Sequence, residues 1–176
     1  MFKKHRMSFL HKILWIICGL CLVEGTSNGQ EEKFKALFIY NFTKYIQWPG
    51  NLEGDFKIAV IGNKELADEL NIVASKKTVG QNTISVTSAK SAASIKQCQI
   101  AYISRENMDQ LSELVEKAKN SNILIITESP KSCLQGACLN FVSVSGSIKF
   151  EISKTNIEGY GLKVSAALMN LGIVVN

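Results

Sequence analysis

The chain has 176 residues, of which 46% are hydrophobic and 20% charged, and its formal net charge at neutral pH is +5. This length fits one domain that can bury about two thirds of its unfolded surface, so neither a structural metal nor a dense disulfide framework is needed. No internal repeat and no low-complexity linker interrupts the sequence, which excludes a repeat protein or a multidomain chain.

The first 29 residues have the composition of a secretory signal peptide. Four basic residues precede an apolar run of 11 residues at 13–23, and small residues follow at 27–29. The run is too short to cross a membrane, which takes about 20 apolar residues. We expect cleavage near Gly29, with Gly25 as the alternative, and hence a periplasmic mature domain of residues 30–176 that does not itself span the membrane.

The net charge and the histidine content that bear on function are those of residues 30–176, after removal of this signal peptide. The mature segment holds 16 basic and 14 acidic residues, so the excess positive charge that nucleic-acid binding requires is lost. Both histidines, His5 and His11, also lie in the leader. Without imidazole the mature chain lacks the commonest general base and metal ligand. We therefore expect no catalytic residue, no metal site and no cofactor.

The first mature segment, residues 34–49, is predicted to be a helix that ends near Gln47. Its apolar residues recur at helical spacing and define one broad face. That face consists of Phe34, Leu37, Phe38, Phe42, Tyr45 and Ile46. The lysines at 33, 35 and 44 are assigned to solvent. Pro49 disfavours a helical conformation at Trp48, so the segment is interpreted as a core helix with Trp48 at its exit.

Alternating apolar runs and amphipathic segments then predict an α/β fold. Three apolar runs, at 56–61, 98–104 and 123–127, have the pattern of strands buried on both faces. Helical segments at 64–74, with Asn63 as the candidate N-cap, and at 107–119 separate them, and residues 83–87 alternate as an edge strand does. This order predicts a single-domain, three-layer sandwich around a mainly parallel sheet. A C-terminal β-hairpin at 139–144 and 147–152 and a last helix at 162–171 complete the prediction.

Three cysteines remain in the mature chain. Cys133 and Cys138 are separated by four residues, and in an oxidising compartment we predict a disulfide between them that stabilises the domain by only about 2 kcal/mol because the loop is short. Cys98 precedes an apolar strand and is interpreted either as a buried inert thiol or as a redox-responsive one. Their spacing does not fit a zinc site.

Motifs for catalysis and nucleotide binding are missing. The first strand-to-helix turn, residues 62–65, has one glycine where a dinucleotide fingerprint needs three. No histidine-based triad and no Ser-x-x-Lys arrangement exists. Aspartates and glutamates are assigned to solvated surfaces. We therefore expect a binding protein and not an enzyme.

Five segments occur in a characteristic order: KALFIYNFTKYIQWP, CQIAYIS, ILIITES, GACLNF and KFEISKTNIEGYGLKVSAALMNL. Together they resemble the YfiR-like family of secreted bacterial proteins over nearly all of the mature chain. The resemblance implies a periplasmic regulator, tending to dimerise, that binds the periplasmic region of a membrane-bound diguanylate cyclase and represses it. Lower cyclic-di-GMP and less biofilm would follow. It also implies that Cys133 and Cys138 match one family bridge, whereas Cys98 matches a second bridge whose partner cysteine is missing, so full redox control is not expected.

The C-terminal residues Leu171, Ile173, Val174 and Val175 form an apolar run that we interpret as a surface for the membrane partner. The alternative is that this run is a buried strand or helix end. A second function remains open: a periplasmic small-ligand-binding accessory of a sensor histidine kinase or a transporter, with the ligand in the crevice at the strand ends.

Overall fold

The computed structural model describes residues 27–175, so the predicted signal peptide lies outside the described residues up to position 26. The unit described below begins at Glu31. Within residues 27–175, no helix combines the length and the apolar composition that a membrane crossing requires.

An eight-stranded sheet forms the centre of this unit, in the order β10-β8-β7-β6-β5-β2-β4-β3. Its strands are β2 (Phe56–Ile61), β3 (Thr78–Val79), β4 (Asn82–Ala89), β5 (Ile100–Ile103), β6 (Leu124–Thr127), β7 (Leu139–Val144), β8 (Ser147–Ile152) and β10 (Ile173–Val174). Neighbours from β4 to β7 are parallel, and β7 and β8 form an antiparallel hairpin. The mixed α/β class, the mainly parallel sheet and the hairpin are thereby confirmed, while the division into three layers stays a prediction.

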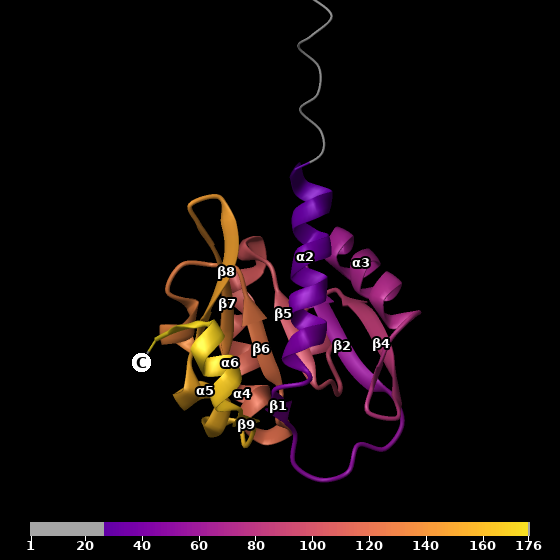
Figure 1. Ribbon diagram of the computed structural model, residues 1–176. Coiled ribbons are helices and arrows are strands. Elements are labelled where there is room, and N and C mark those ends of the chain that lie inside the picture. Colours follow the sequence, from indigo (N-terminus) through magenta and orange to yellow (C-terminus); the bar gives the residue numbers. More distant parts are fainter. Residues whose placement is uncertain (1–26, 176) are drawn as a thin grey trace, which may run out of the picture. The chain divides into compact units, whose positions relative to one another are not determined.

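The central strands owe their place to their continuous apolar sequences. Every residue of β5 and of β6 is buried, and Lys57 alone is exposed in β2. Strands of this composition are stable only where both faces of the sheet are covered. Helices supply much of this cover: α2 (Ser27–Phe42), α3 (Lys64–Ala74), α4 (Leu111–Ser121), α5 (Lys154–Gly159) and α6 (Ala166–Leu171). Figure 1 shows α2 in front of the sheet, between β5 and β2 in this view.

The first helix differs from its prediction in both its end and its buried face. Helix α2 stops at Phe42, and Ile46–Gln47 forms strand β1, paired with strand β9 (Lys163–Val164). Phe34 and Leu37, predicted to be core residues, are 47% and 41% exposed. The buried positions are 32, 35, 36, 39, 42 and 43, which have the same helical period in a shifted phase. The helical period and the burial of Phe42 and Ile46 are confirmed, whereas the placement of Phe34 and Leu37 in the core was wrong.

The predicted last helix is also shorter than its apolar pattern suggested. Residues 163–164 pair with β1, and α6 begins after Ser165, whose hydroxyl accepts a hydrogen bond from the backbone N–H of Leu168. Beyond Gly172 the chain forms β10, which pairs in parallel with β8. Strand pairing has replaced helix at the N-terminal end of this segment, where β1 satisfies the backbone groups, whereas the predicted end at Leu171 is confirmed.

Gly62, the residue after β2, lets two neighbouring loops approach closely. Its φ is +80°, and a Cβ atom there would lie 1.8 Å from Oδ1 of Asn107 and 2.3 Å from Oγ of Ser104. The positive φ and the missing side chain are thus both required at this position.

We predict that Gly62→Ala lowers the free energy of unfolding by about 2–5 kcal/mol, because backbone strain and steric overlap add. Urea denaturation measures this loss. Gly80→Ala isolates the strain, since φ is +60° there and nothing lies within 4 Å; about 1–2 kcal/mol is expected. At Gly159 φ is not positive and nothing lies within 4 Å of an added Cβ atom. Gly159→Ala should therefore change the free energy of unfolding by less than about 1 kcal/mol. Equal losses at positions 62 and 80 would contradict the packing argument.

Candidate functional site

The carboxyl ends of β2 and β5 mark the point where the strand order reverses. The chain passes from β2 to β4 on one side and then to β5 on the other, and doubly wound sheets bind ligands at such a switch point. Here the space beside Gly62 is occupied by Ser104 and Asn107, whose side chains hydrogen-bond at 2.9 Å between Oγ and Oδ1. The space next to Gly62 is therefore filled by the protein itself.

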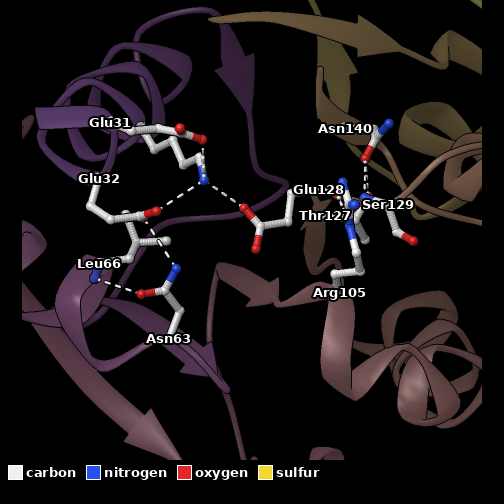
Figure 2. Close-up of polar contacts among 10 residues, drawn as sticks. Glu31, Glu32, Asn63, Leu66, Arg105, Thr127, Glu128, Ser129 and Asn140 are labelled. Atoms are coloured by element: carbon white, nitrogen blue, oxygen red, sulfur yellow. Dashed lines mark hydrogen bonds and ion pairs between the residues drawn. The ribbon is translucent and has the colours of Figure 1, made fainter. Parts of the chain in front are cut away.

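Helix α2 places a buried lysine over these strand ends. Nζ of Lys35 lies 2.9 Å from Glu31, 3.0 Å from Glu32 and 2.6 Å from Glu128, and only 6% of the lysine side chain is exposed. Figure 2 shows the carboxylates of Glu31 and Glu32 on α2 and that of Glu128 beyond β6 converging on the ammonium group. We call these four residues the Lys35 cluster. It ties the first helix to the end of a central strand.

Asn63 joins the Lys35 cluster to the loop after β2. Its Nδ2 donates to Oε2 of Glu32 at 3.1 Å, while its Oδ1 caps α3 by accepting from the backbone N–H of Leu66 at 2.9 Å. The predicted cap of this helix is thus confirmed. The same amide has a second role, because it orients the buried carboxylate that faces Lys35.

The electrostatics of the Lys35 cluster favour a charged lysine. Burial opposes the charge, but hydrogen bonds to Glu128, Glu31 and Glu32 outweigh it and raise the pKa of Lys35. For Glu32 the balance is reversed: burial raises its pKa above the ordinary value of 4.5 despite the attraction of Lys35. The hydroxyl of Tyr102 is buried nearby without a hydrogen-bond partner among residues 27–175. Burial and the Glu128 carboxylate raise the pKa of this phenol, which keeps it neutral.

A second polar network joins strands β6, β7 and β8 by hydrogen bonds. Oδ1 of Asn140 accepts hydrogen bonds from the Thr127 hydroxyl at 2.9 Å and from the Ser129 backbone at 2.8 Å, and its Nδ2 donates to Glu151 at 2.7 Å. The Arg105 guanidinium donates to the carbonyl of Glu128 at 3.1 Å. Figure 2 shows this network beyond Glu128, on the far side from α2. A cavity of about 520 Å³ opens beside it.

These contacts identify two errors in the sequence interpretation. Lys35 was assigned to solvent and the glutamates to solvated surfaces, whereas Lys35 and Glu32 are buried. Two signals pointed to the pairing: Glu31 and Glu32 lie four and three residues before Lys35, and Glu128 directly follows a buried strand. All three carboxylates are committed to the lysine. Among residues 27–175 no group of three or more His, Cys, Asp or Glu side chains is arranged to hold a metal ion.

The predicted partner-binding residues lie beside an apolar groove. Leu171 is 67% exposed and Val174 50%, and Ile173 is also exposed, whereas Val175 is half-buried and donates its backbone N–H to Ile152 at 3.0 Å. Leu171 and Ile173 line a cavity of about 550 Å³, which we call the C-terminal groove. Its other apolar walls are Phe38, Phe42 and Tyr45 near the end of α2, Ile148 and Phe150 on β8, and Leu168 on α6.

An aromatic cluster fixes the α2 wall of this groove. The ring centroid of Phe42 lies 5.0 Å from that of Phe150 and 6.1 Å from that of Phe141, and Phe38 contacts the same two rings at 6.1 Å. Such aromatic pairs contribute about 0.5–1.5 kcal/mol each beyond the area they bury. The exposed residues Phe34 and Leu37 extend the apolar surface of α2, although the sequence placed them in the core.

All three mature cysteines are buried free thiols in the structure. Burial raises the pKa of Cys98, of Cys133 and of Cys138 to about 12 in each case, so the reactive thiolate is scarce at neutral pH. Nδ2 of Asn156 bridges the carbonyls of Cys133 and Ala137 at 2.7 and 2.8 Å. This amide holds the loop without a covalent link, and the disulfide between Cys133 and Cys138 stays a prediction.

Comparison with known proteins identifies the family. The sequence model of the YfiR/HmsC-like family (DUF4154) matches residues 32–173. The chain belongs to the YfiR/HmsC-like family. The match begins at Glu32 of the Lys35 cluster and ends at Ile173 of the C-terminal groove, so the groove and all of the cluster except Glu31 fall within the YfiR/HmsC-like domain. No curated protein matches the chain in sequence.

A solved structure has a similar fold. It is the crystal structure of a conserved domain protein from Vibrio cholerae O1 biovar El Tor str. N16961, with a TM-score of 0.57 and 12% sequence identity. The alignment covers 82% of this YfiR/HmsC-like chain but only 60% of the Vibrio chain. At this identity the likeness shows a common fold alone.

We predict that Lys35→Met lowers the free energy of unfolding by about 3–5 kcal/mol, because three carboxylates are left around an apolar side chain. Urea denaturation is the measurement. Lys33→Met removes an exposed lysine from the same helix and should change stability by no more than about 0.5 kcal/mol. A Lys35→Met protein as stable as the Lys33→Met control would show that the Lys35 cluster does not hold α2.

The raised pKa of Glu32 predicts that the free energy of unfolding depends on pH. The folded chain binds this proton more tightly than the unfolded chain, so the contribution of Glu32 to stability grows as pH falls through its folded-state pKa and is complete below 4.5. The free energy of unfolding of the wild type, minus that of Glu32→Gln, should therefore rise from neutral pH to about pH 4.5. Urea titrations of both proteins across this range test it, and a constant or falling difference would contradict the assignment.

Proposed function

We propose that this protein is an exported regulator that binds the periplasmic region of a membrane-bound diguanylate cyclase and represses it. The observation that carries the proposal is the match to the YfiR/HmsC-like family over residues 32–173. Repression lowers cyclic-di-GMP and with it biofilm formation. The proposed mechanism is stoichiometric binding without turnover of a substrate, which agrees with a mature chain that contains no histidine.

The C-terminal groove is the contact surface that we propose for the cyclase. Leu171 and Ile173 are exposed at its rim, and large exposed apolar side chains that adjoin an apolar groove gain free energy when a partner removes them from water. A signal that lowers the affinity of this contact releases the cyclase and switches it on. The degree of repression would thus depend on the fraction of cyclase molecules to which the protein is bound.

The edge of the sheet supports a further part of the proposal, a homodimer. Among the strands of residues 27–175, β10 is the last on its side of the sheet and pairs with β8 alone. The outer edge of such a strand is free to pair with a second copy of the chain. Sedimentation of the purified mature protein measures this association.

The functional test is the cellular level of cyclic-di-GMP in a strain that lacks this protein. Reintroducing the wild type should lower the nucleotide, whereas Leu171→Glu should leave it at the level of the deletion strain, because a carboxylate at the groove opposes apolar contact. Ile72→Glu is the matched control, since Ile72 is an exposed apolar residue on α3 that does not line the groove.

Two outcomes would overturn this proposal. If cyclic-di-GMP is the same with and without the protein, cyclase repression is wrong. If Leu171→Glu represses as well as the wild type while remaining folded and exported, the groove is not the contact surface. Deleting residues 173–176 gives a second variant for the same comparison, with thermal unfolding to show whether Val175 is needed for the fold.

A further inference from the structure

A second hollow lies at the opposite end of the sheet, where the parallel strands begin. Its volume is about 480 Å³, within the range of small-molecule sites. Phe56 opens β2, Asn82 opens β4, Gln99 immediately precedes β5 and Asn122 lies two residues before β6. The loop from Trp48 to Asp55 closes the hollow from outside, and Figure 1 shows this connection between β1 and β2 as a wide curve at the lower end of the sheet. We call it the amino-end cavity.

Trp48 supplies an aromatic wall that is held in place. Its indole N–H donates to the carbonyl of Gln99 at 3.2 Å, and its ring meets that of Phe56 edge to face, with centroids 5.0 Å apart. Trp48 is only partly buried. A partly exposed aromatic ring fixed by its own hydrogen bond is a surface on which the apolar face of a ligand can pack without further ordering of the side chain.

Five carboxamides line the amino-end cavity, and three of them, those of Gln99, Asn82 and Asn122, are each fixed by one of two polar atoms. Oε1 of Gln99 accepts from the backbone N–H of Lys57 at 2.7 Å. Nδ2 of Asn82 donates to the carbonyls of Leu52 and Gly54, and Nδ2 of Asn122 donates to that of Tyr160 at 2.8 Å. The opposite atom of each amide has no hydrogen-bond partner among residues 27–175. One donor and two acceptors are therefore oriented in advance and free to bind a ligand.

The charges around the amino-end cavity limit the kind of ligand. Its charged lining residues are Glu53, Asp55 and Lys57, so a phosphate or carboxylate would meet more negative than positive charge. Asp55 is already engaged by the hydroxyl of Thr83. A ligand that both donates and accepts hydrogen bonds, has an apolar face and has no charge fits these groups best.

We propose that the amino-end cavity binds a neutral saccharide of one or two rings, with its hydroxyls on Gln99, Asn82 and Asn122 and one ring face against Trp48. Sugar hydroxyls donate and accept, which matches the mixed set of free amide atoms. This site is separate from the C-terminal groove, so the inference does not depend on repression of a cyclase. It assigns a ligand to the end of the sheet opposite the Lys35 cluster.

Tryptophan fluorescence can report ligand binding, because Trp48 lines the amino-end cavity. Of its two tryptophans, Trp15 lies in the leader, so Trp48 is the only tryptophan of residues 30–176. Fluorescence of the mature protein is titrated with glucose, galactose, N-acetylglucosamine, maltose and diacetylchitobiose. At least one of them should give a saturable change, and calorimetry should return the same affinity. No saturable response to any of the five would overturn the proposal.

Gln99→Glu tests the site itself. A glutamate keeps the oxygen that accepts from Lys57 but replaces the free donor, so affinity for the responding sugar should fall at least about tenfold. Gln110→Glu is the matched control, because Oε1 of Gln110 accepts from the backbone of Ala92 at 2.8 Å in the same way outside the cavity. Thermal unfolding confirms that both variants fold. Unchanged affinity in Gln99→Glu, or an equal loss in Gln110→Glu, would refute this site. An equal response to glycine would refute the ligand class.

Discussion

The attraction between one buried ammonium group and three carboxylates determines where the first helix lies. Lys35 can be buried because Glu31, Glu32 and Glu128 surround it within 3.0 Å, and an uncompensated charge at this position would cost several kcal/mol. The requirement selects one rotation of α2. Lys35 and Ile39 face the sheet, and Phe34 and Leu37 are left in water. The α2 wall of the C-terminal groove follows from this choice, because Phe38 and Tyr45 lie on the same chain segment.

The same contacts fill part of the crevice at the carboxyl ends of the strands, and a cavity of about 520 Å³ remains beyond Glu128. In a doubly wound sheet the crevice at the carboxyl ends of the strands is the usual ligand site. In this protein Ser104 and Asn107 occupy the space beside Gly62, and the Lys35 cluster covers the neighbouring strand ends. The amino ends have no comparable ion cluster within residues 27–175. Their lining includes five amides and one tryptophan beside Glu53, Asp55 and Lys57, and the amides and the tryptophan suit an uncharged ligand better than a partner protein.

Two surfaces of different chemistry therefore coexist on one scaffold. The C-terminal groove is bounded by short elements, α6 and β10, that carry exposed apolar side chains. The amino-end cavity is lined by polar side chains whose orientation is set by backbone hydrogen bonds. Apolar contact suits regulation by a protein partner, and oriented amides suit discrimination among small polar molecules.

The sequence by itself determined the mixed α/β class, the three central strands, the hairpin and the Asn63 cap. Each of these depends on neighbouring residues: strands buried on both faces are apolar throughout, and a cap needs one side chain near the helix start. Only the tertiary structure decided the phase of α2, the burial of Lys35 and the pairing of β1 with β9. An amphipathic period shows that a helix has a buried side, but a helix with apolar residues around most of its surface has more than one candidate side. Which of them faces the sheet depended on Glu128, a carboxylate 93 residues away along the chain, and no local pattern contains that information.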